Sequence, residues 1–435
     1  MRLGEVAKAF SGYAFKSISF ADSGIPVIKI KNIKLGYINL TDVQYVDEAF
    51  LSIDEKFHVK AGDILISLTG SHLTQPGSVV GRIAIHSQSN GLCLLNQRAG
   101  KIVVTDQNRC DPKYLFFRLT TEESRYSIAS MAYGAANQAN ISPSQVESLE
   151  ISLPPLITQQ KISSILSAYD DLIENNTRRI KILEEMAQRI YREWFVHFRF
   201  PGHENMKMVE SELELIPEGW DVKRLEELVE NKKFSIVDGP FGTQLHSNEY
   251  TTKGIPVVRV INLSYEGHFI DDDLVYITEE KFQTLIRSAI YPDDILLAKT
   301  GATIGKLALF PSKLGKGLIT SSVLKISPDK KKYNTFYIYN FIKNLSDKKY
   351  WEKISLGTTR PSLTLSDVKD IKLLEPPNEI VKTFHSMVEP FYDSLQNLEL
   401  KNKTLRQTRD LLLPKLVSGK IDVSNLDIDV GAIDA

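Results

Sequence analysis

The sequence is poor in cysteine and has no long apolar run, and these absences exclude several classes of protein. Two cysteines, Cys93 and Cys110, occur in 435 residues, which is too few for a disulfide framework. Both are therefore interpreted as structural thiols. No stretch approaches the roughly 18 to 20 apolar residues that span a membrane, and no apolar run follows a basic leader. We expect a cytoplasmic protein with no membrane partner.

Signatures of catalysis and metal binding are also missing. No group of Cys and His residues has metal-ligand spacing. Residues 301–306, GATIGK, have one residue too few between the glycines for a phosphate-binding loop. Asp293, Asp294 and Lys299 resemble part of a nuclease site, but their spacing is too short, so a turn and a strand are the preferred interpretation. We expect no enzyme activity and no bound metal or cofactor.

The charge balance leaves nucleic-acid binding open. The chain has 53 basic and 54 acidic residues, for a formal net charge of −1. A DNA-binding protein can keep its basic residues on one face and balance them elsewhere. The composition, 42% hydrophobic and 25% charged, is typical of a globular protein, and the length suggests two to four domains.

Two long heptad patterns are the strongest feature that is present. In each, mostly apolar residues recur at alternating steps of four and three, which predicts a long helix with a packed seam. The first pattern consists of Ile162, Leu166, Tyr169, Ile173, Asn176, Ile180, Leu183, Ala187, Ile190 and Trp194. The second consists of Phe384, Val388, Phe391, Leu395, Leu398, Asn402, Leu405, Arg409, Leu412 and Leu416. Pro390 lies inside the second pattern and predicts a kink or an interruption there.

The asparagines in the two seams favour antiparallel packing of the helices. In a parallel pair, Asn176 and Asn402 would each face an apolar residue, and a buried unpaired amide costs about 1 to 3 kcal/mol. In an antiparallel pair the two asparagines meet, and Tyr169 faces Arg409, which can lie on an aromatic ring. Neighbouring layers then pair Ile180 with Leu398 and Leu183 with Leu395. Chance alignment of the two asparagines is the alternative.

The second half of the sequence repeats the first. GIPVVRVINL at Gly254 corresponds to GIPVIKIKNI at Gly24, and PDDILLAKTG at Pro292 corresponds to AGDILISLTG at Ala61. Each half is thus interpreted as one globular domain of strands, turns and short helices followed by one long helix. The predicted boundaries are residues 1–155 for the first domain, 156–200 for the first helical region, 201–377 for the second domain with a linker at 201–216, 378–425 for the second helical region and 426–435 for a tail.

The predicted fold class is α+β, with two mixed α/β domains separated by two long helices that pack as an antiparallel coiled coil. This arrangement places the duplicated domains in a pseudo-twofold relation. Two readers of this kind suit two DNA half-sites in inverted orientation, about 34 Å or one helical turn apart. Because the repeats differ in their loops, the two halves of the site are expected to differ.

The sequence resembles the specificity subunit of type I restriction and modification enzymes over essentially its whole length. The resemblance is carried by the repeated GIPV segments, by DGPFGTQLHS at Asp238, by the TG pairs at Thr69 and Thr300, by GTTRPSLTLSDV, and by RDLLLPKLVSGKID at Arg409. It implies that each domain is a target recognition domain for one half of a bipartite DNA site. It further implies that the helices set the gap and dock two methyltransferase subunits.

The same resemblance implies further partners and assigns the cofactors to them. Restriction and translocase subunits join the complex, and S-adenosylmethionine, ATP and magnesium are expected on the partner subunits rather than on this chain. The expected host is a bacterium or an archaeon. The alternative from the enzyme class is the remnant specificity half of a fused restriction-methyltransferase. A purely structural coiled-coil adaptor is a third interpretation, but it would not need two domains with diverged polar loops.

Candidate DNA-binding residues are chosen by their position in the repeat, in the Gly-rich loops and in the segment before each closing strand. Amides and Arg suit base contacts, whereas Lys and Thr more often hold phosphate. In the first domain the candidates are His72, Thr74, Gln75, Arg82, Asn137 and Gln138. In the second domain they are Gln244, Thr300, Thr303, Lys306, Thr359 and Arg360. Solvated loop residues without a partner are the alternative for any of them.

Overall fold

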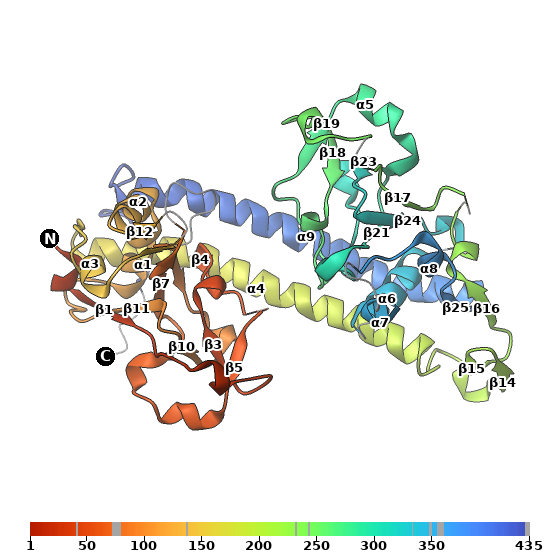
Figure 1. Ribbon diagram of the computed structural model, residues 1–435, viewed down its shortest axis with the longest axis horizontal. Helices are drawn as coiled ribbons and strands as arrows, with labels where there is room; N and C mark the ends of the chain where they lie inside the picture. Colours follow the sequence, from red (N-terminus) through yellow and green to blue (C-terminus); the bar gives the residue numbers. More distant parts are fainter. Residues whose placement is uncertain are drawn as a thin grey trace. The chain divides into compact units, whose positions relative to one another are not determined.

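The structure is a computed structural model that describes residues 1–430 except 41, 72–79, 136–137, 231–232, 242–243, 333, 348–349 and 355–360. The chain divides into two compact units. The first unit is Met1–Asn175 with Lys401–Ala435, and the second is Asn176–Leu400. Each unit combines one globular domain with part of both long helices (Figure 1).

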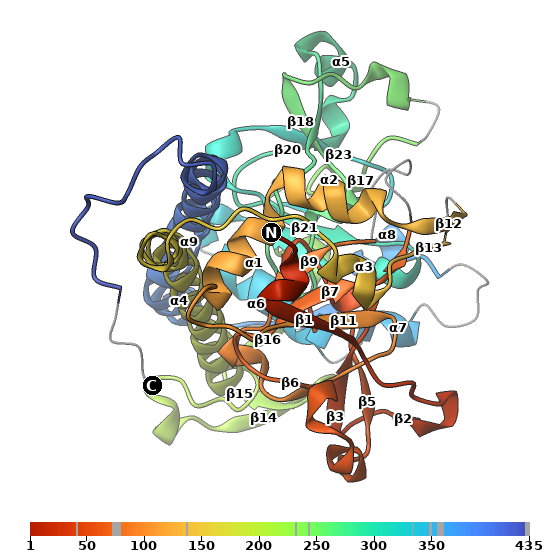
Figure 2. The ribbon, with the colours of Figure 1, turned by 90° about the vertical axis from the view of Figure 1, so that its left-hand side faces the viewer.

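The first domain is built on two five-stranded sheets. The first sheet has the order β1 (Ala7–Ser11), β11 (Ala99–Val104), β7 (Ile64–Ser67), β9 (Ile83–Ile85) and β4 (Gly36–Tyr37). The second has the order β2 (Phe20–Ala21), β5 (Gln44–Val46), β3 (Ile25–Ile28), β10 (Cys93–Leu95) and β6 (His58–Val59). In Figure 2, β1, β11 and β7 are seen side by side. All four residues of β7 are buried, so this strand is the centre of the domain core.

Three helices and a small sheet complete the first domain. The predicted helical segment near residues 112–125 is two helices, α1 (Pro112–Thr120) and α2 (Glu122–Ser130). They separate at Thr121, whose hydroxyl accepts a hydrogen bond from the Ser124 N–H and so caps α2. The other elements are α3 (Pro143–Glu147) and the three-stranded sheet of β12 (Tyr133–Ala135), β13 (Gln138–Asn140) and β8 (Thr69–Gly70).

The second domain repeats the strand order of the first, which confirms the duplication. One sheet has the order β17 (Ile236–Asp238), β24 (Val323–Ile326), β21 (Ile295–Ala298) and β22 (Leu307–Leu309). The other has the order β19 (Val275–Ile277), β18 (Ile255–Val258), β23 (Gly317–Ile319) and β20 (Ala289–Ile290). The parallel pair β18–β23 has the same place as the parallel pair β3–β10 of the first domain.

The remaining elements of the second domain surround these sheets. Two strand pairs are present, β14 (Met208–Ser211) with β15 (Glu214–Pro217) and β16 (Asp221–Arg224) with β25 (Lys372–Glu375). The short helices are α5 (Glu279–Thr284), α6 (Asn334–Asp347), α7 (Tyr350–Ile354) and α8 (Leu365–Lys369). The helix α6 corresponds to α1 in chain order and contributes several buried residues to the core of the second unit.

A buried asparagine fixes the turn after each GIPV strand. In the second domain the Asn262 Oδ1 accepts from the Arg259 N–H at 2.9 Å, and its Nδ2 donates to the carbonyl of Ile270 at 2.9 Å and of Asp272 at 3.2 Å. Asn32 makes the corresponding three hydrogen bonds in the first domain. Both side chains are buried, so these asparagines organise the scaffold and are not available to a ligand.

Two 40-residue helices, α4 (Leu156–Phe195) and α9 (Asn378–Val417), form the predicted antiparallel pair. In the second unit the start of α9 packs on the end of α4, with the ring centroids of Trp194 and Phe384 6.0 Å apart. In the first unit the start of α4 packs near the end of α9, where Ile162, Leu166 and Leu416 share one core. Within each unit the helices therefore run in opposite directions.

Two details of the predicted seam can be compared with the structure. Arg409, expected on the ring of Tyr169, instead forms an ion pair with the carboxylate of Asp170, which offers a full charge in place of an aromatic face. The helix α9 continues through Pro390, so of the two predicted alternatives the interruption is absent, whereas a kink stays a prediction. Packing explains this continuity, because Val388 and Leu395 on either side of the proline are buried in the core of the second unit.

The predicted polar layer of the seam consists of Asn176 and Asn402, and the contact between their amides stays a prediction. Asn176 and Asn402 are both buried, and the Nδ2 of Asn402 donates to the carbonyl of Ile173 at 3.5 Å. Asn176 and Asn402 fall in different units, so a pairing of their amides remains untested. Ile180, Leu395 and Leu398 are buried in one core and Leu183 packs against it, as expected for the spacer.

The cysteines and the membrane expectation can be compared with the structure directly. Cys93 and Cys110 are both free and buried, and burial raises the pKa of each thiol to about 12. Among the described residues, none of the helices has the length and apolar character needed to cross a membrane. Among the same described residues, no group of three or more His, Cys, Asp or Glu side chains is placed so that it could hold a metal ion.

We predict that Asn262→Leu destabilises the protein by about 3 kcal/mol, because it places an apolar side chain at a buried position and leaves one N–H and two carbonyls without their partner. Denaturant unfolding of the full chain would measure the free energy. Asn248→Leu is the matched control, since Asn248 is exposed and its replacement should change stability by less than about 0.5 kcal/mol. Equal losses for the two variants would contradict a role of Asn262 in holding the turn.

Candidate nucleic-acid interface

In the first domain the end of the central strand meets the segment that precedes the closing strand. β8 pairs with β13, so that Thr69 lies opposite Asn140 and Gly70 opposite Ala139. The Thr69 hydroxyl donates to Asn140 Oδ1 at 2.9 Å, and the Ile141 N–H donates to the carbonyl of Leu68 at 2.8 Å. The described residues that border the two candidate segments, Thr69–Gly70 and Ala139–Asn140, therefore lie side by side.

The second domain contains the same junction. Its Leu363 N–H donates to the carbonyl of Lys299 at 2.8 Å, the Gly301 N–H donates to the carbonyl of Pro361 at 2.8 Å, and Thr300 forms a bridge with Ser362. Main-chain hydrogen bonds at corresponding positions thus hold both loops in one register. Because main-chain bonds do not depend on side-chain identity, the loops can diverge without loss of the junction.

A basic residue follows a left-handed glycine at the same place in both domains. Arg82 bonds through its main chain to Ser67, and Lys306 bonds in the same way to Ala298. The preceding Gly81 and Gly305 have φ of 76° and 91°, a conformation that glycine adopts without strain. The Lys306 Nζ lies 5.5 Å from the centroid of the Tyr265 ring, a cation–π contact. The two domains therefore present different cations from one scaffold position.

The structure describes half of the predicted DNA-binding residues. His72, Thr74, Gln75, Asn137, Thr359 and Arg360 lie outside the described residues. Of the others, Thr300, Thr303 and Lys306 lie in one turn, where the Thr303 hydroxyl donates to the carbonyl of Thr300 at 2.8 Å. Gln138 is exposed at the start of β13, and Gln244 is exposed in a separate turn. DNA contact by any of these residues stays a prediction.

The residues that resemble a nuclease site have separate structural roles. The Lys299 Nζ donates to the buried Asp238 carboxylate at 2.7 Å, and Arg287 approaches the same carboxylate at 3.8 Å. Asp294 instead accepts from the Tyr291 N–H at 2.8 Å, and burial raises the pKa of its carboxyl above the usual value. Lys299 therefore faces Asp238, a partner that the sequence analysis did not identify.

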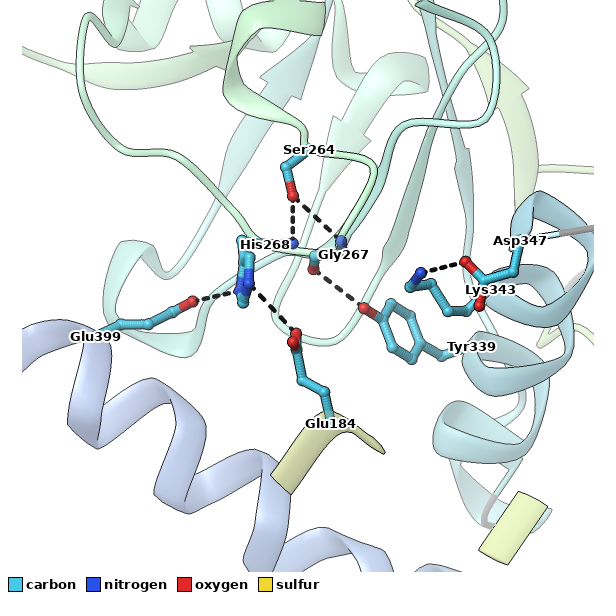
Figure 3. A network of polar contacts seen from close by, with 8 residues as sticks. All are labelled: Glu184, Ser264, Gly267, His268, Tyr339, Lys343, Asp347 and Glu399. Carbon is cyan, nitrogen blue, oxygen red and sulfur yellow. Dashed lines mark hydrogen bonds and ion pairs between the residues drawn. The ribbon is translucent and has the colours of Figure 1, made fainter. Parts of the chain in front are cut away.

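A histidine attaches the second domain to both long helices (Figure 3). The His268 Nε2 lies 3.5 Å from Glu184 Oε1 on α4, and its Nδ1 lies 3.0 Å from Glu399 Oε1 on α9. The His268 loop is itself held in place, because the Ser264 hydroxyl accepts from the His268 N–H at 2.9 Å and the Tyr339 hydroxyl donates to the Gly267 carbonyl at 3.0 Å. A groove of about 390 Å³ lies beside these residues.

The His268 network favours the protonated histidine. Burial alone lowers the pKa of His268, but the hydrogen bond that the ring donates to Glu399 and the charges of Glu184 and Glu399 outweigh burial and raise this pKa above its usual value. Burial raises the pKa of Glu184 to about 7, against the opposing effects of His268 and Lys343. The sequence analysis missed this network because its members are 131 residues apart at the widest contact and no local pattern links them.

The duplicated fold and the repeated junction define a two-domain reader carried on paired helices. Comparison with known families agrees with this class: the type I restriction modification DNA specificity domain matches residues 1–185 and 217–406. The chain belongs to this family and contains its domain twice. The resemblance that the sequence motifs indicated is thereby confirmed.

Individual relatives are similar over most of their length. The type I restriction enzyme MjaIX specificity subunit of Methanocaldococcus jannaschii is 28% identical over 88% of this chain and 84% of its own. The type I restriction enzyme HindI specificity subunit of Haemophilus influenzae is 23% identical over 96% of this chain and 97% of its own length. The crystal structure of the S subunit from M. genitalium has the same fold, with a TM-score of 0.55 at 16% identity over 96% of this chain and 95% of that one. These names describe recognition subunits, in agreement with the predicted non-catalytic role.

We predict that the stability of the protein falls as the pH rises through about 7. A group whose pKa is higher in the folded than in the unfolded chain binds more protons when folded, and both His268 and Glu184 have raised pKa values. The contribution of His268 is complete below pH 6.5, its usual pKa, and is lost above its folded pKa. Denaturant unfolding at a series of pH values would measure the slope.

His268→Gln should make this pH slope shallower, because the glutamine does not titrate. His197→Gln serves as the matched control, since His197 is exposed and outside the network. A slope that His268→Gln leaves as steep as in the wild type would contradict the role of the network.

Proposed function

We propose that this chain is the DNA sequence-specificity subunit of a type I restriction-modification complex, in which each domain reads one half of an asymmetric, bipartite site. The observation that carries the proposal is the junction that occurs twice, Thr69–Asn140 in the first domain and Thr300–Ser362 in the second. Both junctions present diverged polar loops from one scaffold. Base contacts in the major groove require polar side chains at defined positions, and a repeated scaffold with unlike loops supplies them.

The long helices are proposed to set the gap between the half-sites and to bind two methyltransferase subunits. Their seams are buried, but each helix also has apolar side chains in solvent. Ile182 and Met186, four residues apart on α4, are 54% and 42% exposed, and Leu411 on α9 is 66% exposed. Neighbouring apolar residues on a helix surface are typical of a protein interface. We propose that a methyltransferase subunit covers them.

The restriction and translocase subunits are proposed to join the complex through the methyltransferases. In this proposal S-adenosylmethionine, ATP and magnesium bind to the partner subunits, and the complex acts in the cytoplasm of a bacterial or archaeal host, where the DNA is accessible. A separate subunit is favoured over the remnant half of a fused enzyme, because the chain matches 84% to 97% of the length of relatives that are named as subunits.

We predict that the complex of this chain with its methyltransferase methylates a split, asymmetric sequence with a fixed unread gap. Two unlike readers held at a set distance cannot produce a continuous motif. Single-molecule methylome sequencing of a host that carries both genes would show the motif, and deletion of this chain should abolish it. A continuous or palindromic motif would contradict two independent readers.

Exchange of residues 24–153 for the corresponding segment of a relative should change only one half of the methylated motif. The reason is that this segment lies within the first unit, whose core is separate from that of the second. Methylome sequencing of the exchanged strain is the measurement, and the reciprocal exchange in the second domain is the control. A change in both halves would show that the domains do not read independently.

A further inference from the structure

One short segment of the second domain, residues 264–268, contacts both a candidate DNA-binding turn and the two long helices. At its start the Ser264 carbonyl accepts from the Leu307 N–H at 2.9 Å. The Tyr265 hydroxyl donates to the Ala302 carbonyl, and the centroid of its ring lies 5.5 Å from the Lys306 Nζ. This coupling segment therefore holds the turn that carries Lys306, and all of its contacts lie within the second unit.

The other end of the coupling segment is a bridge made by one imidazole ring (Figure 3). The His268 Nδ1 lies 3.0 Å from Glu399 Oε1 on α9, and its Nε2 lies 3.5 Å from Glu184 Oε1 on α4. A neutral imidazole has one N–H, whereas the protonated ring has two. Loss of the proton leaves a lone pair facing one of the carboxylates, so the bridge is complete only while His268 is charged.

The coupling segment is held tightly between its two ends. The Ser264 Oγ accepts from the N–H groups of Gly267 and His268, at 3.2 and 2.9 Å. Gly267 has a φ of 104°, and a Cβ on it would lie 2.2 Å from the Tyr339 Oη of α6. This close approach leaves the segment little freedom, so the position of the ring determines the position of the turn.

The other charged side chains around the bridge balance one another. Those that line the groove beside it are Lys181, Glu185 and Arg192 on α4, Lys343 and Asp347 on α6, and Glu266 in the coupling segment. Three of them are basic and three are acidic, and Lys343 is paired with Asp347. Glu266 also raises the pKa of His268. The charge of His268 therefore decides how strongly the segment is attracted to the two helices.

The first domain has a different side chain at this position. The Lys34 N–H donates to the Tyr37 carbonyl at 3.0 Å, as the Ser264 N–H donates to that of His268 at 3.2 Å. The counterpart of His268 is thus Tyr37, which is 57% exposed and has no positive charge. We therefore expect the effect of the bridge on the second half-site.

On the basis of the proposed function, we propose that His268 is a positioning residue that fixes the gap between the two half-sites, by holding the coupling segment and its turn on both helices. One added base pair moves a half-site by about 3.4 Å along the duplex and turns it by roughly 35°. A domain that the bridge holds cannot follow this displacement, whereas a released domain can. The bridge thus contributes discrimination between gap lengths and little affinity for the bases.

The test is DNA binding by the full chain in complex with its methyltransferase, measured by fluorescence anisotropy. Four duplexes are compared: the motif with the gap that the methylome reports, the motif with one base pair added to the gap or removed from it, and a scrambled sequence. At about pH 6 the wild type should prefer the native gap roughly tenfold or more. His268→Gln should bind the native gap with nearly unchanged affinity and reduce this preference roughly fivefold.

The charge of the ring gives a second readout. In the wild type the preference for the native gap should fall between about pH 6 and about pH 9, as His268 loses its proton above its raised pKa. His268→Gln should have a low preference throughout. His268→Arg stays charged and has several N–H groups for the two carboxylates, so it should keep the preference throughout. His197→Gln is the matched control, since His197 is exposed, and should follow the wild type.

The ratio between duplexes separates positioning from a merely structural role. The proposal is overturned if His268→Gln weakens binding to all four duplexes by the same factor, or leaves the preference for the native gap unchanged at about pH 6. It is also overturned if the wild type does not distinguish gap lengths, or if His268→Arg loses the preference as His268→Gln does. If the wild type does not prefer the motif over the scrambled duplex, the proposed function fails instead.

Discussion

The proposed reading surface of each domain depends on a main-chain hydrogen bond between two segments that are far apart in the sequence. The Ile141 N–H bonds the Leu68 carbonyl in the first domain, and the Leu363 N–H bonds the Lys299 carbonyl in the second, both at 2.8 Å. This bond joins the end of the central strand to the segment before the closing strand. Because neither partner uses its side chain, selection can alter the loops while the surface on which they stand is retained.

The side chains around this shared scaffold differ in ways that make the domains electrostatically unlike. Lys299 forms a buried ion pair with Asp238, whereas its counterpart in the first domain, by the same main-chain bond, is Leu68. His268 occupies the position of Tyr37, since the Ser264 N–H bonds the His268 carbonyl as the Lys34 N–H bonds that of Tyr37. A buried ion pair adds little net stability but penalises alternative packings. These polar contacts therefore restrict the packing of the second domain in a way that the first domain, with Leu68 and Tyr37 at these positions, does not repeat.

The sequence predicted what is encoded locally and repeatedly, namely the duplicated domain, the helix seams and their antiparallel direction. It could not predict contacts between distant single residues. Asp238 lies 61 residues from Lys299 and Glu399 lies 131 residues from His268, and no periodicity links either pair. The absence of an interruption at Pro390 has a different cause, since local helix propensity was overridden by burial of the flanking seam residues.

Charge neutralisation inside the scaffold explains how a DNA reader can have a formal net charge of −1. Scaffold cations have carboxylate partners within their own domain: Lys31 pairs with Asp42 at 2.6 Å, Lys101 pairs with Asp63 at 3.4 Å, and Lys299 pairs with Asp238. Lys29 lies over the Phe20 ring, with its Nζ 3.7 Å from the ring centroid. These cations are thereby committed to the fold and add little to the field at the reading surface.

Net charge therefore says little about whether a chain of this kind binds DNA. What matters is where the cations lie, and several of them are already paired with carboxylates of their own domain, as Lys31 is with Asp42 and Lys299 is with Asp238. A formal net charge near zero is thus compatible with a local excess of basic side chains on one face.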